Sequence, residues 1–136
     1  MKQEQKALLI KDLYARLLYG VKCEVVKYSA DGEMLFIRNG QAALPITVEN
    51  VKELVTNNLY EIKSYLFPLS SMTEEQCYEL HSIRSGFQDC WKFIKTPIPL
   101  AICNFEQIDW FHKNHLDYRG LIPMGLAIDA TGLNIY

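Results

Sequence analysis

The sequence has few cysteines and no long hydrophobic run, and these shortages exclude several classes of protein. Its four cysteines are Cys23, Cys77, Cys90 and Cys103. No two lie closer than thirteen positions, so no Cys-x-x-Cys metal or redox motif occurs, and we expect reduced thiols. No apolar run approaches the roughly 20 residues of a membrane span. The first apolar stretch stops at Lys11 and Asp12, which leaves no signal-peptide core, so we expect a cytoplasmic protein.

The chain also lacks an excess of charge of either sign. Fourteen Lys and Arg against sixteen Asp and Glu leave a net charge of −2, which disfavours general attraction to nucleic acid or to an anionic membrane. It has no glycine-rich phosphate loop and no dinucleotide fingerprint, so we expect no cofactor. With 49% hydrophobic residues in 136, it has enough apolar side chains for one core, which predicts a single globular domain over 1–136.

The first half of the chain changes from a helical to an alternating pattern. Apolar residues at spacings of three and four predict a helix that ends near Gly20, with Asp12 and Arg16 paired at i, i+4. Between 21 and 46 the pattern alternates, and Asp31-Gly32 and Asn39-Gly40 are typical of tight hairpin turns. We therefore expect a three-stranded antiparallel meander or partial barrel, with its third strand at 42–46.

Further helices are predicted by their N-caps. Thr47 favours a short helix that stops at 57–58, and the residues from 59 to 69 favour a strand or extended segment. Capping boxes at Thr73 and Asn104 predict helices over about 74–84 and from 105 to near 115. The fold class is therefore α+β: an N-terminal helix, a small antiparallel meander or partial barrel, and two or more short helices in the C-terminal half.

Segments spread along the whole chain carry a resemblance to a known family. They are residues 11–17, 19–22, 62–76, 108–110, 115–122 and 125–127. In these segments the chain resembles a family of small uncharacterised proteins from gut Bacteroidetes and their phages. The resemblance implies a bacterial or phage cytoplasmic setting and a role connected with mobile elements, and it carries over no catalytic residues.

One segment concentrates side chains that are able to do chemistry. Its candidate ligand-binding residues are His115, Asp117, Tyr118, Arg119 and Gly120. Arg119 offers a planar fork of donors for phosphate or carboxylate, and Gly120 would permit close approach of the backbone to a bound anion. The alternative is a structural turn in which Asp117 and Arg119 pair with other groups of the fold.

Two other patterns suggest a ligand. On one helix, Asp109, His112 and His115 would follow at i, i+3 and i+6, a weaker metal pattern than His-Glu-x-x-His, so we assign no metal ligand. The interleaved aromatic and basic residues around Trp91, Lys92 and Lys95 would suit single-stranded nucleic acid. The net charge instead favours a core strand with solvated lysines there.

No constellation reaches the specificity of an active site, so we expect an accessory or interaction module rather than an enzyme. Its expected partner is another protein, and the sequence also allows a homo-oligomer. A metal-dependent or anion-binding enzyme that uses residues 112 to 119 is the main alternative. A single-stranded nucleic-acid-binding module is the third reading, and a membrane partner is not expected.

Overall fold

The computed structural model describes residues 2–32, 34–38, 46–83 and 104–136, and it has the α+β architecture expected from the sequence. A four-stranded sheet has the order β2-β1-β3-β4. Its strands are β1 (Cys23–Tyr28), β2 (Met34–Arg38), β3 (Tyr60–Leu66) and β4 (Ala127–Asp129). Both neighbours of β1 run antiparallel to it, whereas β4 runs parallel to β3.

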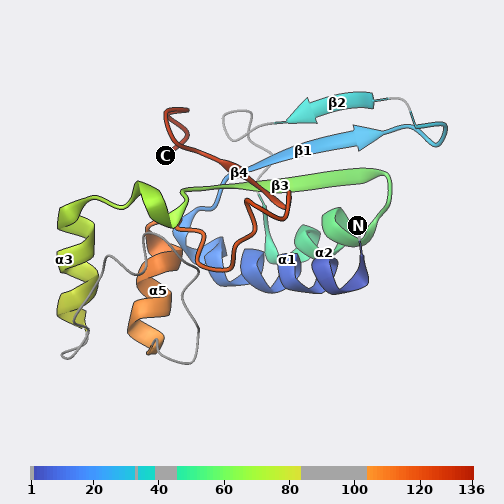
Figure 1. Ribbon diagram of the computed structural model, residues 1–136. Helices are drawn as coiled ribbons and strands as arrows, with labels where there is room; N and C mark the ends of the chain where they lie inside the picture. Colours follow the sequence, from blue (N-terminus) through green and yellow to red (C-terminus); the bar gives the residue numbers. More distant parts are fainter. Residues whose placement is uncertain (1, 33, 39–45, 84–103) are drawn as a thin grey trace.

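Helices α1 (Gln3–Arg16) and α2 (Val48–Thr56) lie together on one face of this sheet (Figure 1). Their contact with the sheet is a cluster of fully buried side chains that includes Leu13 of α1, Val51 of α2 and Val25 of β1. A 3₁₀ turn (Leu17–Tyr19) follows α1, and Gly20 ends it with a φ of +69°, as predicted. The predicted helix after Thr47 is also confirmed.

The antiparallel part of the sheet contains the first hairpin of the predicted meander and a further strand from later in the chain. The hairpin of β1 and β2 around Asp31-Gly32 is confirmed. The second antiparallel neighbour of β1 is β3, which follows α2 in the chain. The strand predicted at 42–46 lies almost wholly outside the described residues. Local turn signals identify hairpins, but they do not reveal a pairing between strands separated by a helix.

A second core lies at one end of the sheet, between α3 (Glu74–Ile83) and α5 (Phe105–Lys113) (Figure 1). Leu80, Phe111, Leu116 and Tyr118 are its most deeply buried members. Both predicted capping boxes are present, because Thr73 pairs with Gln76 and Asn104 with Gln107 through reciprocal hydrogen bonds. Among the described helices, none has the length and apolar character needed to cross a membrane.

Candidate functional site

A buried ionic cluster joins α1 to the loop that follows α5. The Asp12 carboxylate accepts from Arg16 Nε at 2.8 Å and from Arg119 Nε at 3.0 Å, and both Asp12 and Arg16 have no exposed side-chain surface. Arg16 Nη2 also donates to the carbonyl of Leu116 at 2.7 Å. We call these three ionic side chains the Asp12 cluster. The i, i+4 pairing of Asp12 with Arg16 is confirmed, although it lies in the core.

The loop from 117 to 122 is held by its own acidic side chain. Asp117 is buried, and its two carboxylate oxygens accept from the backbone amides of Leu121 and Ile122 at 2.8 and 2.9 Å. Burial raises the pKa of Asp117, and these two hydrogen bonds act in the opposite direction. Gly120 completes the turn with a φ of +75°, so its role here is backbone conformation.

His112 and Tyr118 form a buried polar pair. His112 Nε2 and Tyr118 Oη are 2.7 Å apart, and both residues are less than a tenth exposed. Burial, followed by the nearby Arg16 guanidinium, lowers the pKa of His112 to about 4. The imidazole is therefore neutral at pH 7. The Arg119 guanidinium lies 4.9 Å from the centre of the Tyr118 ring, which gives the ring a cationic neighbour.

His115 does not continue the predicted row of Asp109 and His112. The helix ends at Lys113, and His115 takes a left-handed φ of +57°, so its side chain leaves the helix surface. Its ring stacks on Tyr136 with centroids 3.6 Å apart. Within the described part of the chain, no three His, Cys, Asp or Glu side chains come together in a way that could hold a metal ion.

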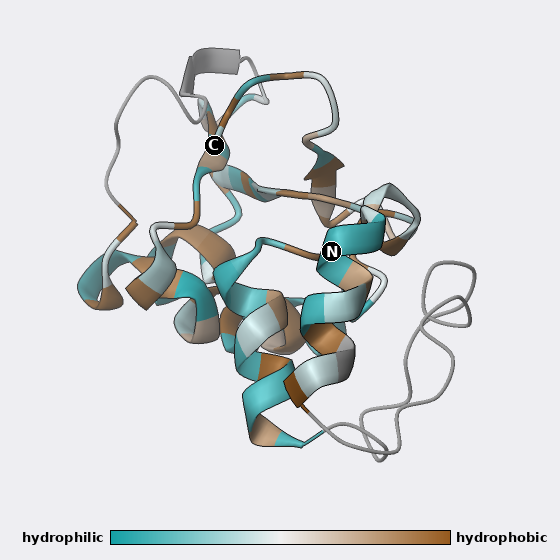
Figure 2. Ribbon diagram, turned by 90° about the vertical axis from the view of Figure 1, so that its left-hand side faces the viewer, coloured by the Kyte–Doolittle hydropathy of each residue, from teal (hydrophilic) through white to brown (hydrophobic). Residues whose placement is uncertain are grey.

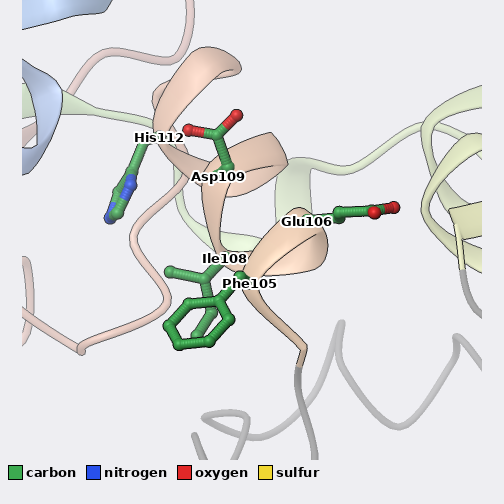
Figure 3. Close-up of a pocket in the computed structure, with 5 residues that line it drawn as sticks. All are labelled: Phe105, Glu106, Ile108, Asp109 and His112. Atoms are coloured by element: carbon green, nitrogen blue, oxygen red, sulfur yellow. The ribbon is translucent and has the colours of Figure 1, made fainter.

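An open hollow lies on the outer side of α5. It has a volume of about 440 Å³ and is lined by Phe105, Glu106, Ile108, Asp109 and His112. In Figure 3, Phe105 and Ile108 lie next to each other, while the two carboxylates point in other directions. The Phe105 side chain is 90% exposed. Phe105, Ile108 and His112 thus line the hollow, whereas Phe111 lies in the core.

The structure brings together part of the set that the sequence singled out. Tyr118 and Arg119 lie against each other, and Asp117 and Gly120 shape the same loop, but His115 contacts a different element. Asp12 and Arg16 were not among the predicted site residues. The feature of the sequence that could have identified them is a pair of opposite charges within the apolar stripe of a helix. Trp91, Lys92 and Lys95 lie outside the described residues.

Asp109, which lines the α5 hollow, is hydrogen-bonded to the 3₁₀ turn that follows α1. Tyr19 donates its hydroxyl to Asp109 at 2.5 Å, and the preceding residue, Leu18, is 85% exposed. Figure 2, turned so that this end of the molecule faces the viewer, shows hydrophobic segments among the hydrophilic ones on the helices. Comparisons with protein-family models, curated proteins and solved structures find no match for this chain.

Proposed function

We propose that the protein is a non-enzymatic accessory module that binds a segment of a partner protein at the α5 hollow. The observation that carries this proposal is the 90% exposure of Phe105 beside the half-buried Ile108. Burying a phenylalanine completely contributes about 1.5–3 kcal/mol, so a partner that covers Phe105 gains a large part of its affinity there. Aromatic side chains that become buried at the centre of an interface are the usual anchors of protein binding.

Charge favours a partner segment that combines apolar and basic residues. The hollow carries the carboxylates of Glu106 and Asp109, and His112 adds no positive charge at pH 7 because its pKa is about 4. A Lys or Arg next to an apolar side chain would complement this surface. Two copies of the chain that met through this surface would bring together four acidic lining residues and no lysine or arginine from the lining, so charge disfavours a homodimer formed here.

The internal contacts of the other candidate residues support docking over anion binding. The Nε donor of Arg119 is used by Asp12, and both oxygens of Asp117 are used by backbone amides. Ion pairs and hydrogen bonds of this buried kind hold the fold together. An incoming phosphate would meet a guanidinium whose positive charge is already partly neutralised by the buried carboxylate of Asp12.

One observation favours a second candidate, an enzyme in which His112 acts as a base. His112 both lines the hollow and hydrogen-bonds Tyr118, an arrangement that resembles a general acid–base pair. A catalytic base works best with a pKa near the working pH, however, and a pKa of about 4 makes His112 a weak base at pH 7. The low basicity of His112 therefore favours docking over catalysis.

The proposed function can be tested by selection from a displayed random-peptide library against the folded protein. We expect enriched peptides with an aromatic or aliphatic residue next to Lys or Arg. Phe105→Ala should weaken their binding at least about tenfold, while its exposed position should leave the melting temperature within about 2 °C. Fluorescence anisotropy gives the affinities.

The matched control is Val48→Ala, which truncates a 62% exposed apolar side chain on α2, away from α5. This variant should bind the selected peptides like the parent protein. Docking at the α5 hollow is excluded if no peptide is enriched, or if Phe105→Ala binds as tightly as the parent. If peptides are enriched and depend on Phe105, the bacterial or phage setting implied by the sequence resemblance guides the choice of natural partners from neighbouring genes.

A further inference from the structure

The antiparallel ladder between β1 and β3 has a side-chain hydroxyl inserted at its end. The register Cys23 with Ser64 places Lys22 opposite Tyr65. Opposed residues of a hydrogen-bonded antiparallel pair normally exchange two backbone hydrogen bonds. The amide of Tyr65 donates to the carbonyl of Lys22 at 2.8 Å, as expected. The amide of Lys22 donates instead to Tyr136 Oη at 2.9 Å, and that hydroxyl donates to the carbonyl of Tyr65 at 2.8 Å.

The aromatic ring of Tyr136 is held on a separate set of contacts. It stacks on His115 with an interplanar angle of 10°, and Lys22 Nζ lies 5.9 Å from its centroid. His115 keeps a left-handed φ of +57° to reach this position, a conformation that is costly for a residue with a Cβ. Its Nδ1 is buried without a hydrogen-bond partner in the described part of the chain. Strained residues of this kind gather at ligand clamps.

The place that Tyr136 fills is open to solvent on one side. Tyr136 is 41% exposed, and residues 131–134 are exposed as well, whereas Ile135 between them is buried against Tyr65 and Ala130. Lys22 Nζ holds the segment through one hydrogen bond to the carbonyl of Ile135 at 2.7 Å. Ile135 and Lys22 thus anchor the backbone of the segment, and the phenol itself enters the end of the ladder from a residue that belongs to none of the strands.

We propose that Lys22, Tyr65 and His115 form a tyrosine socket, a binding site for the phenol of a tyrosyl side chain that Tyr136 fills in cis. The polar end requires one hydroxyl that accepts from an amide and donates to a carbonyl, and the open side requires a flat ring that stacks on His115. A phenyl ring lacks the hydroxyl. A phosphorylated phenol has no proton to donate to the carbonyl of Tyr65, and its charge would face that oxygen. The socket is therefore selective for the free phenol.

Chemical rescue of the Tyr136→Gly variant of this chain tests this selectivity. The probe is 4-methylphenol, which is the tyrosine side chain without its backbone, and the matched controls are toluene and 4-methylphenyl phosphate. We expect 4-methylphenol to shift the NMR resonance of the Lys22 amide in a saturable way and to raise the melting temperature of the variant. Both effects should be absent in the parent protein, because Tyr136 already fills the socket there and competes at a high effective concentration.

Three outcomes would overturn the proposal: no saturable shift with 4-methylphenol, an equal response to toluene, or an equal response to the phosphate ester. If Tyr136→Gly is unfolded alone, the same titration is followed by the return of dispersed NMR resonances, since a ligand that binds only the folded state shifts the folding equilibrium. Recovery with 4-methylphenol alone supports the socket, and an absence of recovery with it counts against the socket.

Discussion

Replacing Asp12 by Asn should destabilise the protein strongly, because it removes the only acidic member of the Asp12 cluster. The Asp12 side chain is fully buried and serves two guanidinium groups, of which that of Arg16 is also fully buried. Removing one partner of a buried ion pair costs about 3–5 kcal/mol, since the remaining charge stays desolvated. Asn retains the size and one acceptor oxygen, so we expect about 3 kcal/mol and a fall in melting temperature of about 10 °C.

Urea unfolding followed by circular dichroism measures this loss. The control is Lys63→Gln, which breaks the half-exposed pair of Lys63 with Glu61 at 3.3 Å and should cost less than about 1 kcal/mol. Combining Asp12→Asn with Arg119→Gln should cost less than the sum of the two single changes, because the second removes a charge that the first left unpaired. A loss below about 1 kcal/mol for Asp12→Asn would refute the view that the folded state needs Asp12 to compensate the buried guanidinium charges.

Three further predictions follow from individual groups. Because burial lowers the pKa values of both His112 and His115 to about 4, the unfolded chain takes up these protons first, so stability is greatest above about pH 7 and falls toward pH 4. Each histidine contributes about 2 kcal/mol of loss between pH 7 and 5, so His112→Gln should remove about half of the pH dependence, and an unchanged pH dependence would contradict the buried neutral state of His112. Burial raises the pKa of Cys23 to about 12, so iodoacetamide mapping should find it unmodified in the native protein and modified in denaturant; native labelling would contradict this. Asn104→Ala removes the N-cap of α5 and should cost about 1 kcal/mol in urea unfolding, whereas an unchanged midpoint would show that the cap is dispensable.

The parts of the fold that depend on short-range signals could be predicted from the sequence. Thr73 and Asn104 identify two helix starts because each cap and its partner are only three residues apart. Gly20 and the turn at 31–32 likewise locate chain reversals. These signals fix the type of an element and its approximate ends, and they were sufficient for the α+β class.

Contacts between distant segments could not be predicted in the same way. Asp12 and Arg119 are 107 positions apart, and the sequence around each residue does not show that the two form an ion pair. The exposure of Phe105 was also missed, since helical spacing shows which residues share a face but not whether that face is covered. The insertion of Tyr136 into the sheet ladder has no local signature at all.

The most direct test of the central claim is to locate where a selected peptide binds by following the amide resonances of the protein. In our proposal the peptide binds at the α5 hollow, and residues 115–122 have a structural role. We therefore predict that the largest shifts fall within residues 104–112, and that they are lost in Phe105→Ala. If the shifts are instead concentrated in residues 115–122, with little change in α5, docking at the hollow is contradicted. Arg119 and its neighbours would then be the binding site.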